Sequence, residues 1–226
     1  MSGSEYVGTL IIRDKKGRER VRKIAAASRR YEEDKVDKRV IRFLTPADVK
    51  GTAMLIFDHD DKNDDMWIYL PALRKTRRIV SSDKGKSFMG SEFSNADMAA
   101  ENTEDFRYTL AGAGEIEGEP CWKIEVVPID EDIADENGFS RKVIWISKND
   151  YVLRHALFYD YYGDLLKEQI NRNILLVDSL NIKYRAGEMT MENIRNGRKS
   201  IMRMDKVIYN PNVKDEYFTT RYLEKQ

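Results

Sequence analysis

The feature that most constrains the fold of this chain is an alternation of apolar and polar residues with a period of two. Successive side chains of a β-strand point to opposite faces, so this period predicts half-buried strands rather than helices. Roughly eleven segments alternate in this way: 6–13, 20–30, 36–44, 52–58, 66–70, 74–80, 106–111, 121–127, 142–147, 152–161 and 165–172. Segments 182–191 and 200–209 complete the series.

Short turn sequences stand between these segments and indicate how the strands are connected. The turns are Lys16-Gly17, 62–64, 148–150, Gly163-Asp164 and Asn196-Gly197. Consecutive strands joined by tight turns predict an antiparallel meander rather than a parallel sheet with crossover helices. Helical signals are few and short, at 45–48, 94–101, 130–137 and 214–223.

Several of the predicted strands are apolar on both faces. In segment 66–70, Trp67 and Tyr69 alternate with three further apolar residues, and segments 52–58 and 142–147 show the same pattern. An antiparallel sheet with one wet face would carry charges at alternate positions. The middle of the sheet is therefore covered on both sides or curled around a cavity. A strongly curved, partly closed barrel and a two-sheet sandwich both fit this periodicity.

Composition excludes several classes of protein. The chain has 226 residues and no Pro- or Ser-rich linker, so we expect a single domain over residues 1–226. Its 39 basic and 39 acidic residues give a formal net charge of zero, and so no overall field attracts nucleic acid or an anionic membrane. The apolar runs stay far below the ~20 residues of a membrane-spanning helix. The single Cys121 excludes an intrachain disulfide.

The sequence Gly85-Lys86-Ser87 is the one candidate for a phosphate-binding loop. Such a loop needs a glycine five residues before its second glycine, and Val80 stands there. The preceding segment 74–80 carries four basic residues, whereas a phosphate loop follows a buried strand. We therefore reject nucleotide binding at this segment.

Metal binding and catalysis have little support in the sequence. The acidic segment 58–65 resembles a calcium loop but lacks the glycine and the glutamate that such a loop needs at its sixth and twelfth positions. His59 and His155 are the only histidines, and no nucleophile motif is present. We expect no metal, no cofactor and no catalytic residues, so the protein is predicted not to be an enzyme.

A basic run beside aromatic residues raises the question of nucleic acid. Arg74, Arg77 and Arg78 follow Trp67 and Tyr69 closely, an arrangement that would suit phosphate contact with base stacking. In a neutral chain, basic residues of this kind are more typical of a solvated strand face. We expect no nucleic-acid partner.

Two segments carry a resemblance to a known family. The sequence over 64–79, with its Trp-x-Tyr-Leu-Pro motif, and the sequence over 84–97, with Ser-Phe-Met-Gly-Ser, resemble the bacterial outer-membrane lipoprotein-sorting proteins. These belong to the superfamily of the periplasmic lipoprotein carriers LolA and LolB. Further similarity lies in 42–52 and in the terminal segment 217–223, so that the resemblance covers nearly the whole chain.

The resemblance implies a mainly β fold: a single curved antiparallel sheet of about eleven strands that forms an incomplete β-barrel. Short helices would cover its open concave side and enclose an apolar cavity, which in the carriers accepts acyl chains. It also implies a periplasmic location, with the signal peptide removed. Members of the family are often encoded beside resistance–nodulation–division (RND) type transporters.

These expectations assign roles to particular residues. We predict that Phe88, Met89 and Phe93 form the apolar contacts of a lid, with the Ser-, Lys- and Gly-rich segment 81–90 as its mobile lead-in. The predicted cavity walls are Met54, Trp67, Tyr69 and Trp145. Arg74, Arg77 and Arg78 are predicted to contact a lipid head group or a partner protein. For each apolar residue the plainer alternative is a place in an ordinary packed core.

Two functions follow from this interpretation. The first is a non-catalytic periplasmic carrier of lipoprotein acyl chains or of another hydrophobic lipid. The second is an accessory module that docks on an RND-type exporter without carrying lipid itself. The sequence leaves the ligand, the partner and the oligomeric state open.

Overall fold

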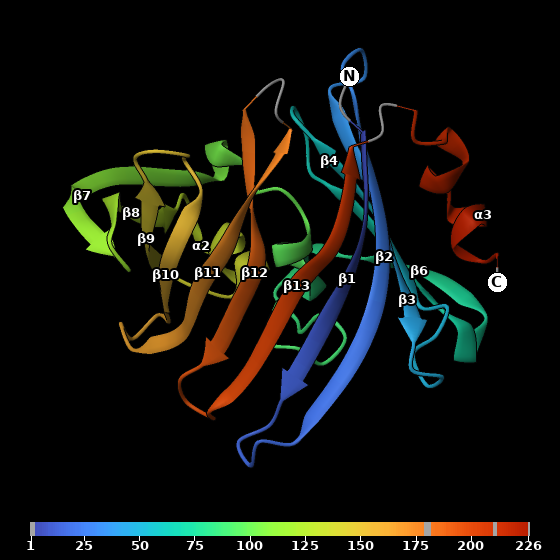
Figure 1. Ribbon diagram of the computed structural model, residues 1–226, viewed down its shortest axis with the longest axis horizontal. Coiled ribbons are helices and arrows are strands. Elements are labelled where there is room, and N and C mark those ends of the chain that lie inside the picture. The colour runs from blue at the N-terminus through green and yellow to red at the C-terminus, as the bar shows by residue number, and fades with distance from the viewer. Residues whose placement is uncertain (1–2, 179–181, 210–211, 226) are drawn as a thin grey trace. The chain divides into compact units, whose positions relative to one another are not determined.

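The computed structural model describes residues 3–178, 182–209 and 212–225, and Figure 1 labels its elements. The strands are β1 Gly3–Arg13, β2 Glu19–Tyr31, β3 Val36–Thr45, β4 Ala53–His59, β5 Asp65–Leu70, β6 Lys75–Ile79, β7 Phe106–Ile116, β8 Glu119–Pro128, β9 Arg141–Ser147, β10 Leu153–Tyr159, β11 Leu165–Asp178, β12 Lys183–Asn193 and β13 Arg198–Tyr209. The helices are short: η1 Pro71–Leu73, α1 Ser81–Lys84, η2 Ala96–Met98, η3 Thr103–Asp105, α2 Glu131–Asn137, η4 Asp215–Phe218 and α3 Thr220–Leu223.

All thirteen strands belong to one antiparallel sheet, in the order β6-β5-β4-β3-β2-β1-β13-β12-β11-β10-β9-β8-β7. The prediction of a mainly β chain with one antiparallel sheet and short helices is confirmed. The sheet has thirteen strands where about eleven were expected, because both of the last two alternating segments form full strands. The sandwich alternative was wrong, since it needs a second sheet.

The chain divides into two compact units. The first contains residues 1–10, 21–81 and 204–226, and the second contains residues 11–20 and 82–203. In the part of the chain that the structure describes, no helix is both long enough and apolar enough to cross a membrane. Within the same residues, no group of His, Cys, Asp and Glu side chains is arranged to hold a metal ion.

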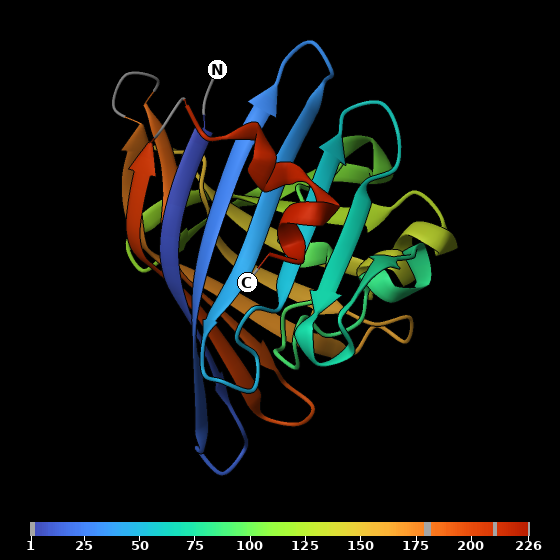
Figure 2. The ribbon, with the colours of Figure 1, turned by 90° about the vertical axis from the view of Figure 1, so that its right-hand side faces the viewer.

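In the first unit, the C-terminal segment packs against one face of strands β2 to β5 (Figure 2). Its residues Val213, Phe218 and Leu223 are all at most 4% exposed. They share a core with a set of residues from the strands: Ala27, Val40, Ala53, Leu55 and Tyr69. Because these apolar side chains leave water only when the segment is in place, their burial holds η4 and α3 on the sheet.

The opposite face of the same strands is also apolar and buried. Its residues include Ile41, Phe43, Met54, Ile56 and Met66, each at most 2% exposed. The predicted two-sided burial of these strands is therefore observed.

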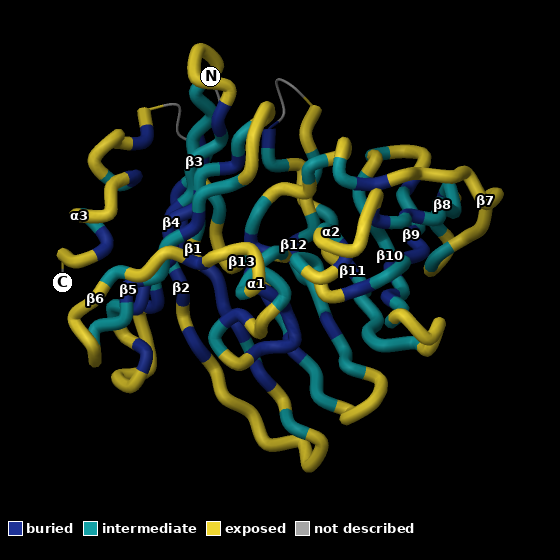
Figure 3. Tube along the Cα trace, turned by 180° about the vertical axis from the view of Figure 1, so that it is seen from behind, coloured by how far each residue is buried: buried dark blue, intermediate teal, exposed yellow. Residues whose placement is uncertain are grey.

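The second unit contains strands of contrasting exposure, as Figure 3 shows. Nine consecutive residues of β7, from Arg107 to Glu115, are exposed, and this strand forms one edge of the sheet. By contrast, Val126, Ala156 and Met191 on strands further inside are at most 1% exposed. The helix α2 is capped by Asp130, whose side chain accepts a hydrogen bond from the backbone N–H of Ile133.

Candidate functional site

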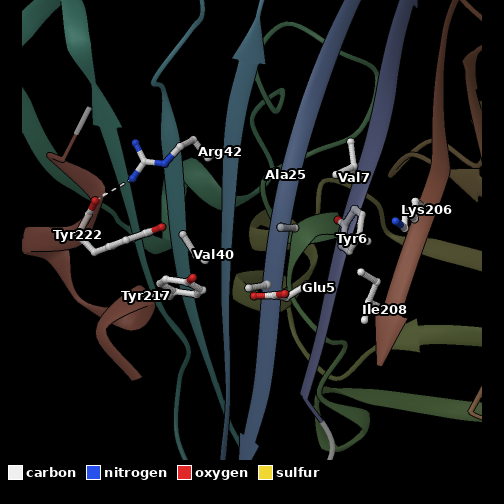
Figure 4. A pocket seen from close by; sticks show the side chains of 12 residues that line it. Glu5, Tyr6, Val7, Ala25, Val40, Arg42, Lys206, Ile208, Tyr217 and Tyr222 are labelled. Atoms are coloured by element: carbon white, nitrogen blue, oxygen red, sulfur yellow. Dashed lines mark hydrogen bonds between the residues drawn. The ribbon is translucent and has the colours of Figure 1, made fainter. Parts of the chain in front are cut away.

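The candidate site is a pocket of about 320 Å³ in the first unit, between the sheet and the C-terminal segment (Figure 4). This volume lies at the lower end of the ~300–1,000 Å³ that is common for small-molecule sites. Twelve residues from β1, β2, β3, β13, η4 and α3 line it: Glu5, Tyr6, Val7, Ala25, Ala26, Ala27, Val40, Arg42, Lys206, Ile208, Tyr217 and Tyr222.

The floor of the pocket exists because strand β2 carries three alanines in succession. Ala25 pairs with Arg42 of β3, and Ala27 pairs with Val40, so these four side chains lie on one face. A methyl group reaches only a short way from the sheet. The space that a longer side chain would fill is therefore left open beneath the C-terminal segment.

Two tyrosines of the C-terminal segment border the pocket on its other side. The rings of Tyr217 and Tyr222 lie 4.9 Å apart between centroids, tilted by 36°. Tyr222 is held in the first turn of α3, where its backbone N–H donates to the hydroxyl of Thr219 at 3.1 Å. A tyrosine has an apolar ring and a polar tip, so this border suits a ligand that is largely apolar.

Arg42 connects the pocket to the end of α3. Its guanidinium donates hydrogen bonds to the carbonyl oxygens of Tyr222 at 2.7 Å, Lys225 at 3.0 Å and Leu223 at 3.3 Å. Carbonyls at the end of a helix lack partners within the helix, and a cation there satisfies them. Burial of the guanidinium lowers the pKa of Arg42, although Tyr222 and Tyr69 act in the opposite direction.

A second anchor holds the start of the C-terminal segment. Arg29 of β2 donates to a carboxylate oxygen of Asp215 at 2.9 Å and to the carbonyl of Val213 at 3.0 Å. The hydroxyl of Tyr31 donates to the same carboxylate. Its burial and this hydrogen bond raise the pKa of Tyr31 to about 12. Two arginines of neighbouring strands thus fix the two ends of the segment.

Two of the predicted wall residues lie on the face that carries the C-terminal segment, but outside the pocket. Tyr69 is in the core below α3, and Trp67 packs edge-on against Phe57 at 5.1 Å between centroids. Met54 pairs with Ile68, which lies between Trp67 and Tyr69 in β5. The side chain of Met54 therefore points to the face opposite to Trp67 and Tyr69. The structure therefore does not bring Met54 together with Trp67 and Tyr69.

The predicted lid residues belong to a tightly bonded loop of the second unit. Phe88 and Phe93 are buried, and the backbone N–H of Phe88 donates to the carbonyl of Phe93 at 2.8 Å. Met89 between them is half-buried and has a positive φ of 52°. Glu92 of this loop accepts hydrogen bonds from Arg198 and Asn193 at 3.0 and 3.1 Å. These contacts attach the loop at Glu92 to β12 and β13, and the mobility expected for segment 81–90 stays a prediction.

Gly85, part of the rejected candidate for a phosphate-binding loop, allows close packing of two helices. A Cβ atom at this position would lie 2.9 Å from the carbonyl oxygen of Asp135 in α2. Beside it, Lys84 forms a 2.9 Å ion pair with Glu136 of the same helix. Only a residue without a side chain allows α1 and the end of α2 to approach so closely.

Trp145, the fourth predicted wall residue, lies in the second unit on a half-exposed patch. Its ring stacks on His155 at 4.9 Å between centroids, and His155 bonds to Glu168 at 2.7 Å. Lys123 lies over the same indole at 5.4 Å.

The three predicted head-group arginines are exposed, but they do not share a face. On the edge strand β6, Arg78 pairs with Trp67 and Arg77 pairs with Ile68, so they point in opposite directions. Arg78 forms an ion pair with Asp65. Arg74 ends η1 in a left-handed conformation with a φ of 49°.

The residues that make the pocket, above all Ala25, Ala27, Val40 and Arg42, were not predicted from the sequence. Two signals were available. A run of three alanines inside a strand predicts a gap in the packing, and the terminal segment with Tyr217 and Tyr222 was part of the family resemblance. The resemblance gave that segment no role.

The fold is shared with solved structures of other proteins. One antiparallel sheet with short helices against it is the architecture of a LolA superfamily protein from Nitrosomonas europaea, with a TM-score of 0.71 at 20% identity. That similarity covers 97% of this chain and 91% of the other, and it is evidence for the fold.

Two further solved structures are more similar. One is a domain assigned to the outer membrane lipoprotein-sorting proteins of Vibrio parahaemolyticus, with a TM-score of 0.89 and 28% identity over 99% of this chain and 92% of the other. The second is a DUF1329 family protein from Desulfovibrio piger, with the same TM-score and identity over 98% and 91%. No curated protein matches the chain.

A family model with the description "Uncharacterized protein" matches residues 35–225, and the chain belongs to this family. One of the two solved structures at 28% identity carries the name outer membrane lipoprotein-sorting protein, so the family predicted from the sequence is confirmed.

Proposed function

We propose that this protein is a non-catalytic periplasmic carrier that holds an acyl chain of a lipoprotein or of another hydrophobic lipid. The observation that carries the proposal is the pocket of about 320 Å³ between Ala25, Ala27 and Val40 on the sheet and the two tyrosines of the C-terminal segment. The similar structure from Vibrio parahaemolyticus is named for lipoprotein sorting, which agrees with this role. A periplasmic location follows from the same role.

Physical chemistry makes the pocket a sufficient holder for an acyl chain. Each CH₂ group that leaves water contributes about 0.8 kcal/mol, so ten such groups contribute ~8 kcal/mol. Before the costs of ordering the chain, this corresponds to a dissociation constant near ~1 μM. No covalent step is needed, and the ligand can be released when the C-terminal segment moves.

The chemistry of the lining supports a carrier rather than an enzyme. The twelve residues include one carboxylate, Glu5, and no histidine, cysteine, serine or threonine. A nucleophile with an adjacent base, the usual minimum for covalent catalysis, is therefore not part of this pocket. The seven apolar residues chosen from the sequence stay predicted ligand contacts outside it.

Mass spectrometry of a solvent extract tests the carrier function. The protein is purified from a bacterial periplasm without detergent, and bound lipid is measured per mole of protein. We expect close to one acyl-bearing lipid per chain, and its transfer to delipidated protein on mixing. An extract without lipid, together with no uptake of a fluorescent fatty acid by the delipidated protein, would refute the proposal.

The second candidate is an accessory module that docks on an RND-type transporter. It is favoured by the basic edge at β6, where Arg74 and Arg77 have no ion-pair partner among the residues that the structure describes. Capture of the membrane partner by the wild type, and its loss in Arg74→Glu/Arg77→Glu, would support docking. The matched control is Lys50→Glu, an exposed charge elsewhere in the first unit.

A further inference from the structure

The pocket carries two charges that this chain does not pair. Glu5 on β1 and Lys206 on β13 both line it, and neither has an ion-pair partner within the described residues. The neighbouring charges behave differently, since Lys23 and Asp205 form a 2.9 Å ion pair to which the hydroxyl of Thr9 also bonds. Glu5 and Lys206 thus remain available to a ligand, whereas Lys23 and Asp205 already pair with each other.

Lys206 lies at the β13 end of the pocket, and Glu5 lies between it and the C-terminal segment (Figure 4). Figure 4 shows the Glu5 carboxylate on the Tyr217 side of Tyr6, and the Lys206 ammonium on the other side of Tyr6. Val7 and Ile208 accompany them, and these two apolar side chains are 40% and 48% exposed. The opposite end lies near Tyr217, Tyr222 and Arg42, where the segment is anchored.

Arg42, the other cationic residue that lines the pocket, already has hydrogen-bond partners within the protein. Arg42 donates to three carbonyl oxygens at the end of α3, which leaves its guanidinium committed to the protein. An anionic ligand would therefore rely on Lys206 and would meet the Glu5 carboxylate. A cationic ligand would meet Lys206, and a neutral ligand would leave both charges without a partner.

A head group that carries both charges satisfies this arrangement. We propose that the pocket selects a lipid with a zwitterionic phosphate–ammonium head group, its phosphate beside Lys206 and its ammonium beside Glu5. The acyl chain then runs over Ala25 and Val40 toward the tyrosines. This inference rests on the proposed carrier function and adds the chemical class of the ligand.

Binding to delipidated protein tests the inference with single-chain lipids of equal chain length. Isothermal titration calorimetry below the critical micelle concentration compares lysophosphatidylethanolamine, lysophosphatidylglycerol and the free fatty acid. Charge-assisted contacts that only the zwitterion makes should favour it by about tenfold. We expect Glu5→Gln and Lys206→Met each to reduce this preference to less than threefold, with an unchanged melting temperature.

Control variants and a soluble head group separate the outcomes. Glu33→Gln and Lys50→Met remove exposed charges elsewhere in the first unit and should leave the preference intact. Equal affinities for the three lipids, or a preference that survives both pocket variants, would overturn the inference while the carrier function stands. Tight binding of glycerophosphoethanolamine alone would overturn the lipid assignment. If no lipid binds, the carrier proposal fails, and this inference fails with it.

Discussion

The guanidinium of Arg42 donates a 2.7 Å hydrogen bond to the carbonyl oxygen of Tyr222 and lies 5.2 Å from the centre of its ring. One side chain of β3 therefore borders the pocket and also holds the helix that covers it. Because α3 has only four residues, its backbone bonds alone cannot keep it helical. Its position depends on the sheet beneath it, and this dependence can be measured.

Replacing Arg42 by methionine should loosen the C-terminal segment. The change removes three hydrogen bonds from a charged donor, each worth ~1.5–3 kcal/mol at most, while it retains much of the apolar volume. We expect hydrogen exchange of residues 213–225 to accelerate by about tenfold or more, with little change elsewhere. Exchange measured by mass spectrometry reports this directly.

Arg77→Met is the matched control, because Arg77 is exposed on β6 and has no ion pair in the described part of the chain. Equal exchange rates in the two variants would show that Arg42 does not anchor α3. In that case burial of Phe218 and Leu223 would be the main attachment.

A large side chain at Ala25 should close the pocket without unfolding the protein. Ala25 is half-buried on the floor, so a tryptophan there can occupy the open volume instead of displacing the core. We expect Ala25→Trp to lower affinity for a fluorescent fatty acid by at least tenfold, at a nearly unchanged melting temperature. Val21→Trp is the control, since Val21 lies on the same face of β2, is 49% exposed and does not line the pocket. Similar losses in both variants would argue against this site.

Attachment of the C-terminal segment should weaken at high pH through Tyr31. Burial and the hydrogen bond to Asp215 raise the pKa of this phenol to about 12, against an ordinary value of 10.0. A group whose pKa is raised in the folded state stabilises that state fully below the ordinary pKa, and the contribution disappears as pH rises toward the folded pKa. Urea unfolding at pH 9, 10 and 11 should therefore show a loss of stability between pH 10 and 12. The loss should be smaller in Tyr31→Phe, and identical pH profiles would refute the role of Tyr31.

The strand pattern of this fold was predictable, but the assignment of residues to faces was not. Trp67 and Met54 were expected on one wall because both lie in strands that are apolar on both sides. Which residues face each other depends on the register of β4 against β5, and a shift by one residue exchanges the faces. The observed pairing of Met54 with Ile68 decides this. No local property of either segment encodes it.

The pocket itself was hidden for a different reason. The predicted cavity walls were large apolar side chains, whereas the pocket arises where side chains are small, at Ala25 and Ala27. The loop around Phe88 was expected to move because Ser, Lys and Gly are common in mobile segments. Its Gly85 instead allows close contact with α2, a contact between segments some fifty residues apart that only the folded chain reveals.

Gly85→Ala should destabilise the second unit for this reason. A Cβ atom would lie 2.9 Å from the carbonyl oxygen of Asp135, so the backbone of α1 or α2 must shift. Overpacking of this kind costs about 1–3 kcal/mol. We expect a corresponding decrease in the free energy of unfolding, measured with urea and circular dichroism. Lys86→Ala, at the adjacent exposed position, is the control and should be near neutral. A stability of Gly85→Ala equal to that of the control would exclude the packing role.

Glu92 should prove to be the main anchor of the loop around Phe88. Its carboxylate is buried and accepts hydrogen bonds from Arg198 and Asn193, while its backbone bonds to Ser200 and Lys167. Glu92→Ala removes the charge and the acceptor of the Asn193 amide, and it leaves the Arg198 guanidinium only its hydrogen bond to the carbonyl of Gly90. Loss of hydrogen bonds to a buried charge costs ~2–4 kcal/mol.

The variant Glu92→Gln separates charge from shape, since an amide oxygen can still accept one hydrogen bond. We expect it to lose about half as much stability as Glu92→Ala, and both should increase hydrogen exchange across residues 86–95. Glu115→Ala on the exposed strand β7 removes a carboxylate with no ion pair among the described residues and should change neither quantity. If Glu92→Ala behaved like Glu115→Ala, the loop would be held by Phe88, Phe93 and the backbone hydrogen bonds to Ser200, Lys167 and Arg198 rather than by the carboxylate. Attachment without the Glu92 carboxylate would agree with the mobile lid that the sequence predicts.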